Sequence, residues 1–216
     1  MRKFIVAALL VGTVATPALA QDANPTFTGP RIEGTLGYDH VGAGSSVSNN
    51  NGRDDQKIDG LLYCGGIGFD FAAGGVVLGV EGEITGSTAK SERVPYTSTF
   101  GFGRVAAGRD LYAGARAGIL ATPNTLVYVK GGYTNAKLNV LAGNTTTTTD
   151  TSFKLDGWRL GAGAERALSS NSFAKLEYRY SKYDDARLEY GNGATSGRFD
   201  IDTDRHQIVA SYGFRF

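Results

Sequence analysis

RHQIVASYGFRF, residues 205–216, alternates apolar and polar side chains almost without a break. Alternate residues of a β-strand share a face. One face carries His206, Ile208, Ala210, Tyr212, Phe214 and Phe216, and the opposite face carries Arg205, Gln207, Val209, Ser211, Gly213 and Arg215. The same pattern recurs along a chain that opens on a secretion signal. The sequence therefore favours strands whose apolar face meets lipid.

The first twenty residues have the pattern of a secretory signal peptide. Arg2 and Lys3 form a positive start, residues 4–14 are almost wholly apolar, and small residues precede a cleavage point between Ala20 and Gln21. The apolar run is too short for a membrane helix, and no later run is long enough either. We predict a cleaved signal peptide over residues 1–20 and export from the cell interior.

The length, charge balance and cysteine count of the chain limit the classes of function that it can have. The chain has 216 residues, which fits one domain. It carries 22 basic and 21 acidic residues, and removing Arg2 and Lys3 leaves 20 against 21, a net charge of −1. This balance gives no reason to expect nucleic acid as a partner. Cys64 is the single cysteine, so no internal disulfide can form. No cofactor and no metal ion are expected.

About eight segments have strand-like alternation and the length that a tilted membrane strand needs. They are residues 31–41, 58–71, 76–86, 111–120, 126–138, 153–166, 173–183 and 205–216. Long and short connections alternate between them, as in bacterial barrels with long extracellular loops and short periplasmic turns. We predict an all-β fold, a closed eight-stranded antiparallel transmembrane β-barrel over residues 31–216. Residues 21–30 are expected to be an extended periplasmic lead-in.

Two long connections and one ambiguous stretch complete this organisation. Residues 139–152 and 183–202 are polar and are expected to be loops. In residues 99–110 the aromatic residues change parity relative to the following strand, and a bulge or loop near Gly103 would reconcile them.

The charged residues decide which face is inside. Facing lipid, each basic residue near the middle of the bilayer would cost about 2–4 kcal/mol. Facing inward, the two signs can pair, and the interior of an eight-stranded barrel is nearly filled by side chains. The predicted lumen network consists of Glu33, Asp70, Glu81, Glu83, Arg116, Lys130, Arg159, Glu165, Lys175, Glu177, Arg179 and Arg215. We expect these charges to plug the lumen rather than to line an open channel.

The order of several short motifs resembles a known family. These are GVEGE (79–83), ARAG (115–118), GWRLGAGAE (157–165), KLEYRYSKY (175–183) and YGFRF (212–216). Together they resemble the small outer-membrane β-barrels of the OmpA/OmpX type, and are most similar to surface-antigen, porin-like barrels of alphaproteobacteria. The resemblance implies insertion by the barrel-assembly machinery in a Gram-negative outer membrane. It also implies that Tyr212, Phe214 and Phe216 act as the assembly signal.

Some small barrels are enzymes, and the two histidines are the candidate catalytic residues of this chain. His40 follows Asp39, and His206 follows Asp204 by two residues. If the first and last strands pair, these rim residues come close together, as a lipid A-modifying enzyme would need. No serine is convincingly placed beside either histidine, so no catalytic residue is assigned. The alternating Asp200, Asp202 and Asp204 could line one strand face, but a solvated loop end is the preferred interpretation.

These features lead to one preferred function and two alternatives. The preferred function is a structural and surface-interaction protein of the outer membrane, whose barrel displays its loops and supports envelope integrity. Its expected neighbours are outer-membrane lipid and lipopolysaccharide, and it is expected to be a monomer because a closed barrel has no free edge. A narrow porin-like channel and a lipid A-modifying enzyme are the alternatives. The sequence names no external ligand.

Overall fold

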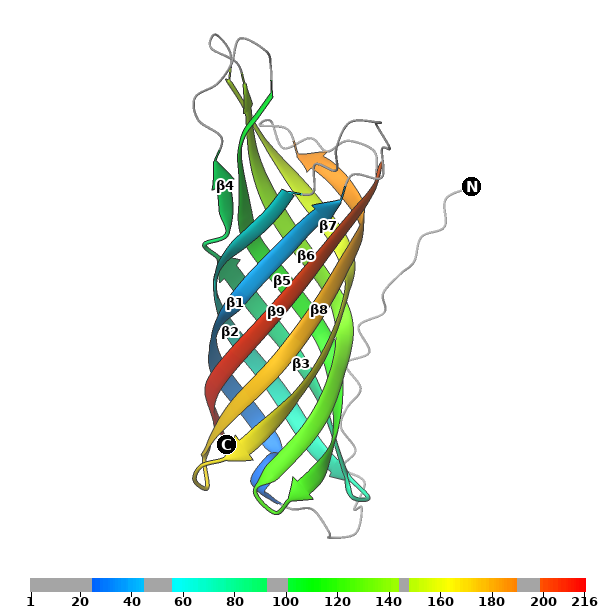
Figure 1. Ribbon diagram of the computed structural model, residues 1–216. Coiled ribbons are helices and arrows are strands. Elements are labelled where there is room, and N and C mark those ends of the chain that lie inside the picture. Colours follow the sequence, from blue (N-terminus) through cyan, green and yellow to red (C-terminus); the bar gives the residue numbers. More distant parts are fainter. Residues whose placement is uncertain (1–24, 45–55, 93–100, 144–147, 190–198) are drawn as a thin grey trace, which may run out of the picture.

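The computed structural model describes residues 25–44, 56–92, 101–143, 148–189 and 199–216. Eight long strands form one closed antiparallel barrel (Figure 1). They are β1 (Gly29–Gly44), β2 (Gln56–Ala73), β3 (Val76–Ser87), β5 (Gly101–Thr122), β6 (Thr125–Gly143), β7 (Thr148–Ala167), β8 (Ser172–Glu189) and β9 (Phe199–Arg215). The pairing of β1 with β9 joins the first and last strands, and the pairing of β3 with β5 completes the ring. The predicted fold class is confirmed.

The strands are longer than the alternation predicted, and the extra length lies mainly at one end of the barrel. β6 and β7 pair up to Gly143 and Thr148, and β8 and β9 reach Glu189 and Phe199. The prediction of unbroken loops over 139–152 and 183–202 is therefore wrong. Outside the bilayer a strand needs no apolar face towards lipid. Backbone hydrogen bonding between strands can therefore continue beyond the last apolar residues of the alternating pattern. The Ser-, Asn- and Gly-rich composition of residues 43–57 also predicts a polar loop, but β1 extends to Gly44 and β2 begins at Gln56, and residues 45–55 lie outside the described part.

The ambiguous stretch 99–110 is a strand with bulges from Gly101 onward. β5 pairs with β6 through this region, with register shifts between Phe102 and Arg104 and between Ala107 and Asp110. Each shift inserts extra residues on β5 and so changes which face the following side chains take. The short strand β4 (Lys90–Glu92) pairs with β5 beside this irregular region.

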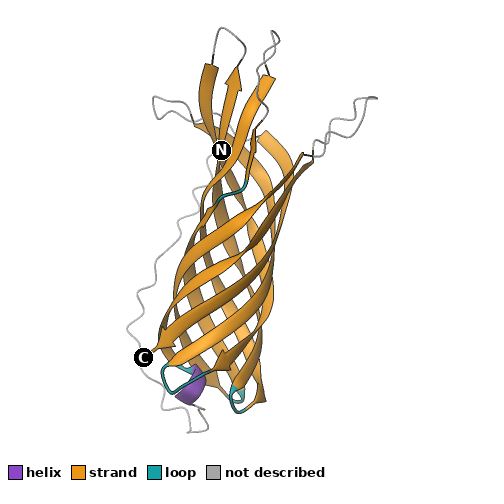
Figure 2. Ribbon diagram, turned by 60° about the vertical axis from the view of Figure 1, so that its left-hand side comes forward, coloured by secondary structure: helices purple, strands orange, loops and turns teal. Residues whose placement is uncertain are grey.

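The lead-in is not extended throughout, contrary to the prediction. Pro25–Phe27 forms a short 3-10 helix, η1, at the end of the barrel where the tight turns lie (Figure 2). Phe27 is fully buried and packs against Val77 and Leu126. Among the described residues, no helix is long and apolar enough to cross a membrane. η1 thus places an aromatic side chain across the turn end of the barrel.

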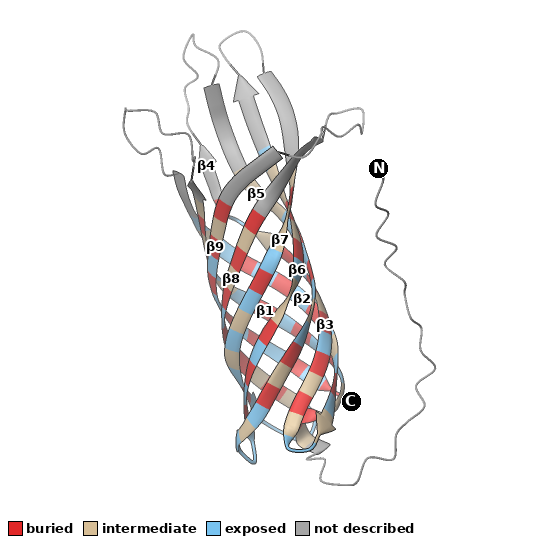
Figure 3. Cartoon of the chain, turned by 90° about the vertical axis from the view of Figure 1, so that its right-hand side faces the viewer, coloured by how far each residue is buried: buried red, intermediate tan, exposed pale blue. Residues whose placement is uncertain are grey.

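Burial alternates along the described side chains of the eight long strands (Figure 3). On β1, Ile32 and Leu36 are 51 % and 60 % exposed, whereas the intervening Glu33 and Thr35 are buried. Similarly, on β9 Phe214 is exposed and Arg215 is buried. This is the reverse of a soluble fold: apolar residues lie outside and charged residues inside, as a barrel in lipid requires.

Candidate functional site

The barrel interior holds a balanced set of charges. Among the side chains that the structure describes, eight basic and eight acidic residues are buried. The basic set is Arg31, Arg116, Lys130, Arg159, Lys175, Arg179, Arg205 and Arg215, and the acidic set is Glu33, Asp39, Asp70, Glu81, Glu83, Asp110, Glu165 and Glu177. Because buried charges are costly unless paired, the equal numbers permit a lumen in which every charge has a partner.

Near the turn end, Asp70 is the centre of an arginine cluster. Its carboxylate accepts hydrogen bonds from Arg31 at 3.0 Å, from Arg215 at 2.8 Å and from two nitrogens of Arg116 at 2.8 Å. Arg116 and Arg215 also bind Glu165, at 2.8 and 2.7 Å. These residues come from β1, β2, β5, β7 and β9, so the cluster crosses the whole lumen.

In the middle of the barrel, Lys130 lies among three carboxylates. Its Nζ is 2.7 Å from Glu81, 2.6 Å from Glu83 and 3.1 Å from Glu177. Tyr128 donates a 2.6 Å hydrogen bond to Glu177. One ammonium therefore ties β6 to β3 and β8 across the lumen.

Two further basic residues connect this middle group to its neighbours. Lys175 binds Glu33 at 2.5 Å, and Glu33 also accepts from Arg31 at 2.8 Å. Arg179 binds Glu83 at 2.9 Å and also pairs with Glu177. The network is thus continuous from the turn-end cluster into the middle of the barrel.

Towards the loop end, Asp110 accepts from four side chains. Arg205 donates at 2.7 Å, Thr134 at 2.6 Å and Tyr183 at 3.2 Å, and Arg159 is the fourth donor. Short charge-assisted bonds of this kind are among the stronger hydrogen bonds in proteins.

Tyrosine rings fill the space between the charged groups. The ring of Tyr112 lies beneath Lys130 and Arg159, with centroid distances of 4.7 and 5.1 Å. The Tyr128 ring lies 5.1 Å from the Arg116 guanidinium. Both arrangements allow cation–π attraction, so the aromatic rings stabilise the cations as well as excluding water.

Small clusters of buried apolar residues lie at both ends of the charged interior. The Phe27 cluster lies at the turn end. At the loop end, Val41 packs with Ala89, and Leu155 packs with Tyr183. The space left among the loop-end residues is about 10 Å³. That is at the lower limit for one water molecule, so this space holds at most about one water.

All twelve residues of the predicted lumen network lie inside the barrel, and each has an ion-pair partner. Four further buried charges were missed: Arg31, Asp39, Asp110 and Arg205. Arg31, Asp39 and Arg205 alternate with the outward-facing residues of their strands, and this alternation could have predicted that they face the lumen. Asp110 was hidden because the bulge in β5 obscures the parity of its neighbours.

The histidine environment differs from the catalytic interpretation. His40 and His206 are partners in the β1–β9 register, as the pairing of first and last strands predicted. However, Asp39 is fully buried and faces the lumen, whereas the His40 Nδ1 lies 2.6 Å from Asp59 on the outer wall. The supposed Asp39–His40 pair is therefore wrong, because neighbouring strand residues point to opposite faces.

The outer wall near the loop end pairs tyrosines with polar partners. Tyr38 donates to Asp59 at 2.5 Å, and Tyr180 donates to Asp204 at 2.6 Å. The Tyr178 hydroxyl lies 2.7 Å from the His206 Nδ1. Aromatic residues of this kind form the girdles of membrane barrels at the interface.

The remaining predicted features are placed as follows. Tyr212, Phe214 and Phe216 point outward and are 51 %, 48 % and 75 % exposed. The side chains of Asp200 and Asp202 and the cleavage residues Ala20 and Gln21 lie outside the described part of the chain. Within that part, no group of three His, Cys, Asp or Glu side chains could hold a metal ion.

A closed barrel with an apolar exterior, an aromatic girdle and a charged interior is an integral outer-membrane β-barrel. Sequence comparison agrees: residues 6–216 match the family described as outer membrane protein beta-barrel domain. The chain belongs to this family, which places it in the outer membrane.

Curated relatives and solved structures lead to the same class. The chain is 27% identical over 179 residues to the 25 kDa outer-membrane immunogenic protein of Brucella melitensis, covering 83% of this chain and 75% of the relative. It is 29% identical over 204 residues to the 31 kDa outer-membrane immunogenic protein of the same organism, covering 82% of each. The crystal structure of Neisserial surface protein A superposes with a TM-score of 0.51 at 14% identity, covering 86% of this chain and 97% of the other. The last comparison shows a shared fold.

Proposed function

We propose that this outer-membrane barrel has a structural and surface-interaction role, with a closed lumen and loops that contact the exterior. The observation that carries the proposal is the balanced interior network of eight buried cations and eight buried anions, with clusters of buried apolar residues at both ends. A pore would need a water path past these ion pairs. In this proposal the predicted lumen residues form ion pairs that hold the strands together and exclude water from the lumen.

The loops carry the proposed surface role. The Brucella relatives are called immunogenic outer-membrane proteins, a name that fits exposed segments on a rigid support. We infer for this chain a similar display of its loops to the exterior, together with a contribution to envelope integrity. The external ligand is a matter for binding experiments, because no described residue identifies it.

The proposal includes a route to the membrane. Residues 1–20 act as a signal peptide cleaved between Ala20 and Gln21, and the barrel-assembly machinery inserts the chain. The outward Tyr212, Phe214 and Phe216 at the end of β9 serve as the assembly signal. Once inserted, the barrel works as a monomer among outer-membrane lipid and lipopolysaccharide, since every long strand has two neighbours and closure removes the free edges. No residue is assigned a catalytic role.

Conductance tests the proposal most directly. Residues 21–216 would be refolded in detergent, shown to be folded by heat-modifiable mobility, and inserted into a planar lipid bilayer. A sealed barrel is expected to give no unitary current. Reproducible, ion-selective steps from folded protein would contradict the closed lumen and support the narrow porin-like alternative.

A further inference from the structure

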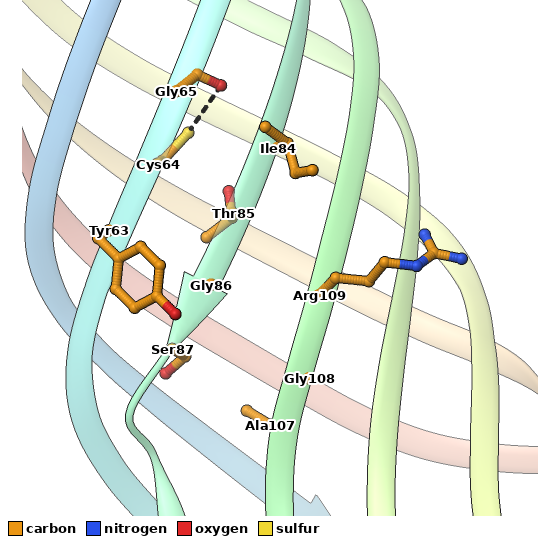
Figure 4. Close-up of a pocket in the computed structure, with 10 residues that line it drawn as sticks. All are labelled: Tyr63, Cys64, Gly65, Ile84, Thr85, Gly86, Ser87, Ala107, Gly108 and Arg109. Carbon is orange, nitrogen blue, oxygen red and sulfur yellow. Dashed lines mark hydrogen bonds between the residues drawn. The ribbon is translucent and has the colours of Figure 1, made fainter.

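The outer wall has a hollow of about 520 Å³ at the loop end of β3 (Figure 4). Direct pairing between β3 and β5 ends at Thr85 and Asp110. Just beyond, β5 carries its register shift between Ala107 and Asp110. The backbones meet again only where the Ala107 N–H donates to the Ala89 carbonyl at 3.0 Å. The hollow lies where the two strands separate.

The rim of this hollow faces the membrane. Tyr63 and Ile84 line it and are 55 % and 59 % exposed. Gly65 lines it as well, and a Cβ added there would meet no atom within 4 Å. Because these residues are on the outer face of the wall, a lipid acyl chain can reach the space beside them.

An arginine without a partner stands at the edge of the same hollow. Arg109 is exposed, and among the described residues no hydrogen bond or ion pair involves it. Figure 4 shows its side chain leaving β5 on the side away from the hollow and extending over the neighbouring strand. No described residue bonds to the guanidinium in that position, so rotation about its side-chain bonds can turn it.

Arg109 differs from other outward-facing basic residues that the structure describes, because those residues have interaction partners. Lys137, Lys154 and Lys182 each have an interaction partner, and Arg166 donates to Thr125. A guanidinium at a membrane surface offers five N–H donors that suit a phosphate. After rotation of its side chain towards the hollow, Arg109 can bind an anionic lipid head group there.

We propose that this hollow is a lipid site, which holds one acyl chain of a phosphorylated outer-leaflet lipid while Arg109 binds its phosphate. The chain lies along Ile84 and over Gly65, and the head group lies at the level of the aromatic girdle. The site goes beyond the structural role proposed above and does not depend on whether the lumen conducts.

Lipid retention measured by native mass spectrometry tests the site. Folded protein in detergent would be titrated with lipid A and, separately, with dephosphorylated lipid A. Gly65→Leu would fill the hollow. Gly34→Leu is its matched control, because Gly34 is the exposed register partner of Gly65, does not line the hollow and has equally open space. Arg109→Gln removes the guanidinium, with Arg166→Gln as the matched control at the turn end.

The expected result is one retained lipid A per wild-type barrel. Arg109→Gln should weaken retention about tenfold, the size of one lost charge-assisted contact. Gly65→Leu should abolish the one-to-one species, whereas the two control variants should retain it. Dephosphorylated lipid A should bind the wild type as weakly as lipid A binds Arg109→Gln.

Two outcomes would overturn the proposal. If Gly65→Leu and Gly34→Leu retain lipid A equally, the hollow does not hold the lipid. If phosphorylated and dephosphorylated lipid A bind equally, Arg109 does not select a phosphate. Heat-modifiable mobility would verify that each variant is folded. A loss of lipid A retention by a folded variant is then due to the altered site and not to unfolding.

Discussion

Arg205 on β9 binds the carboxylate of Asp39 on β1 through two parallel hydrogen bonds of 2.7 Å each. The two residues come from the first and last strands of the barrel, 166 positions apart in the chain. This bidentate contact lies inside the seam that closes the barrel, and Gln207 adds a 3.1 Å hydrogen bond to the same carboxylate. The seam is therefore fixed by side chains as well as by its backbone ladder.

Removing one member of this pair should destabilise the barrel. Asp39→Leu leaves Arg205 with Asp110 as its remaining ion-pair partner and places an uncompensated charge in the lumen. Breaking a buried pair typically costs about 3–5 kcal/mol. Reversible urea unfolding in lipid vesicles, followed by tryptophan fluorescence of Trp158, would measure the loss. A midpoint unchanged from wild type would show that the seam does not need the pair.

The double variant separates charge imbalance from lost attraction. Asp39→Leu with Arg205→Met replaces both charges by apolar groups and leaves Asp110 paired with Arg159. Because buried ion pairs often contribute little relative to apolar groups of similar size, the double variant should be more stable than Asp39→Leu alone. If it is less stable, the contact that Arg205 keeps with Asp110 outweighs the cost of the unbalanced charge.

The sequence was sufficient for the fold class and for most of the lumen. Period-two alternation placed Glu81, Arg116 and Lys130 on the inward face, because a strand has only two faces and lipid excludes charges from one of them. Partners could not be predicted in the same way. Which carboxylate meets Lys130 depends on strand tilt and register, and these are set by the closure of the whole barrel.

Alternation did not predict the positions of residues in the irregular parts of the fold. Asp110 was missed because the bulge in β5 breaks the parity rule just before it. The burial of Phe27 was missed because a residue outside the strands carries no alternation signal, and its place is set by contacts with Val77 and Leu126 at the turn end of the barrel. The outer lengths of β6 to β9 were underestimated because backbone pairing in water requires no apolar face.

Lys130 provides a second test of the lumen network. Lys130→Met leaves Glu81, Glu83 and Glu177 to share fewer cations and changes the described interior from a net charge of 0 to −1. We expect a loss of about 3–5 kcal/mol in unfolding free energy, as for other broken buried pairs. Urea unfolding would measure it, with Arg166→Met as the control because Arg166 is exposed. Equal stability of the two variants would contradict a structural role for Lys130.

Phe27 tests the turn-end cap. Phe27→Ala removes a fully buried ring from the cluster with Val77 and Leu126. Phe→Ala changes in cores cost about 3–5 kcal/mol, and the cavity lies at the mouth of the lumen. Phe71→Ala is the matched control, because Phe71 is 47 % exposed on the outer wall. Thermal unfolding in vesicles should separate the two variants, and equal midpoints would show that η1 does not stabilise the barrel.

Phe216 tests the assembly signal independently of stability. Its side chain is 75 % exposed, so Phe216→Ala should barely change refolding from urea into lipid vesicles. If the terminal aromatic is recognised during insertion, the same variant should accumulate several-fold less in the outer membrane of cells that export it. Phe71→Ala again removes an outward phenylalanine, but away from the chain terminus, and should insert normally. Normal outer-membrane levels of Phe216→Ala would show that the assembly machinery does not recognise this residue. If the variant both accumulates poorly in cells and refolds poorly in vitro, the effect is due to lost stability.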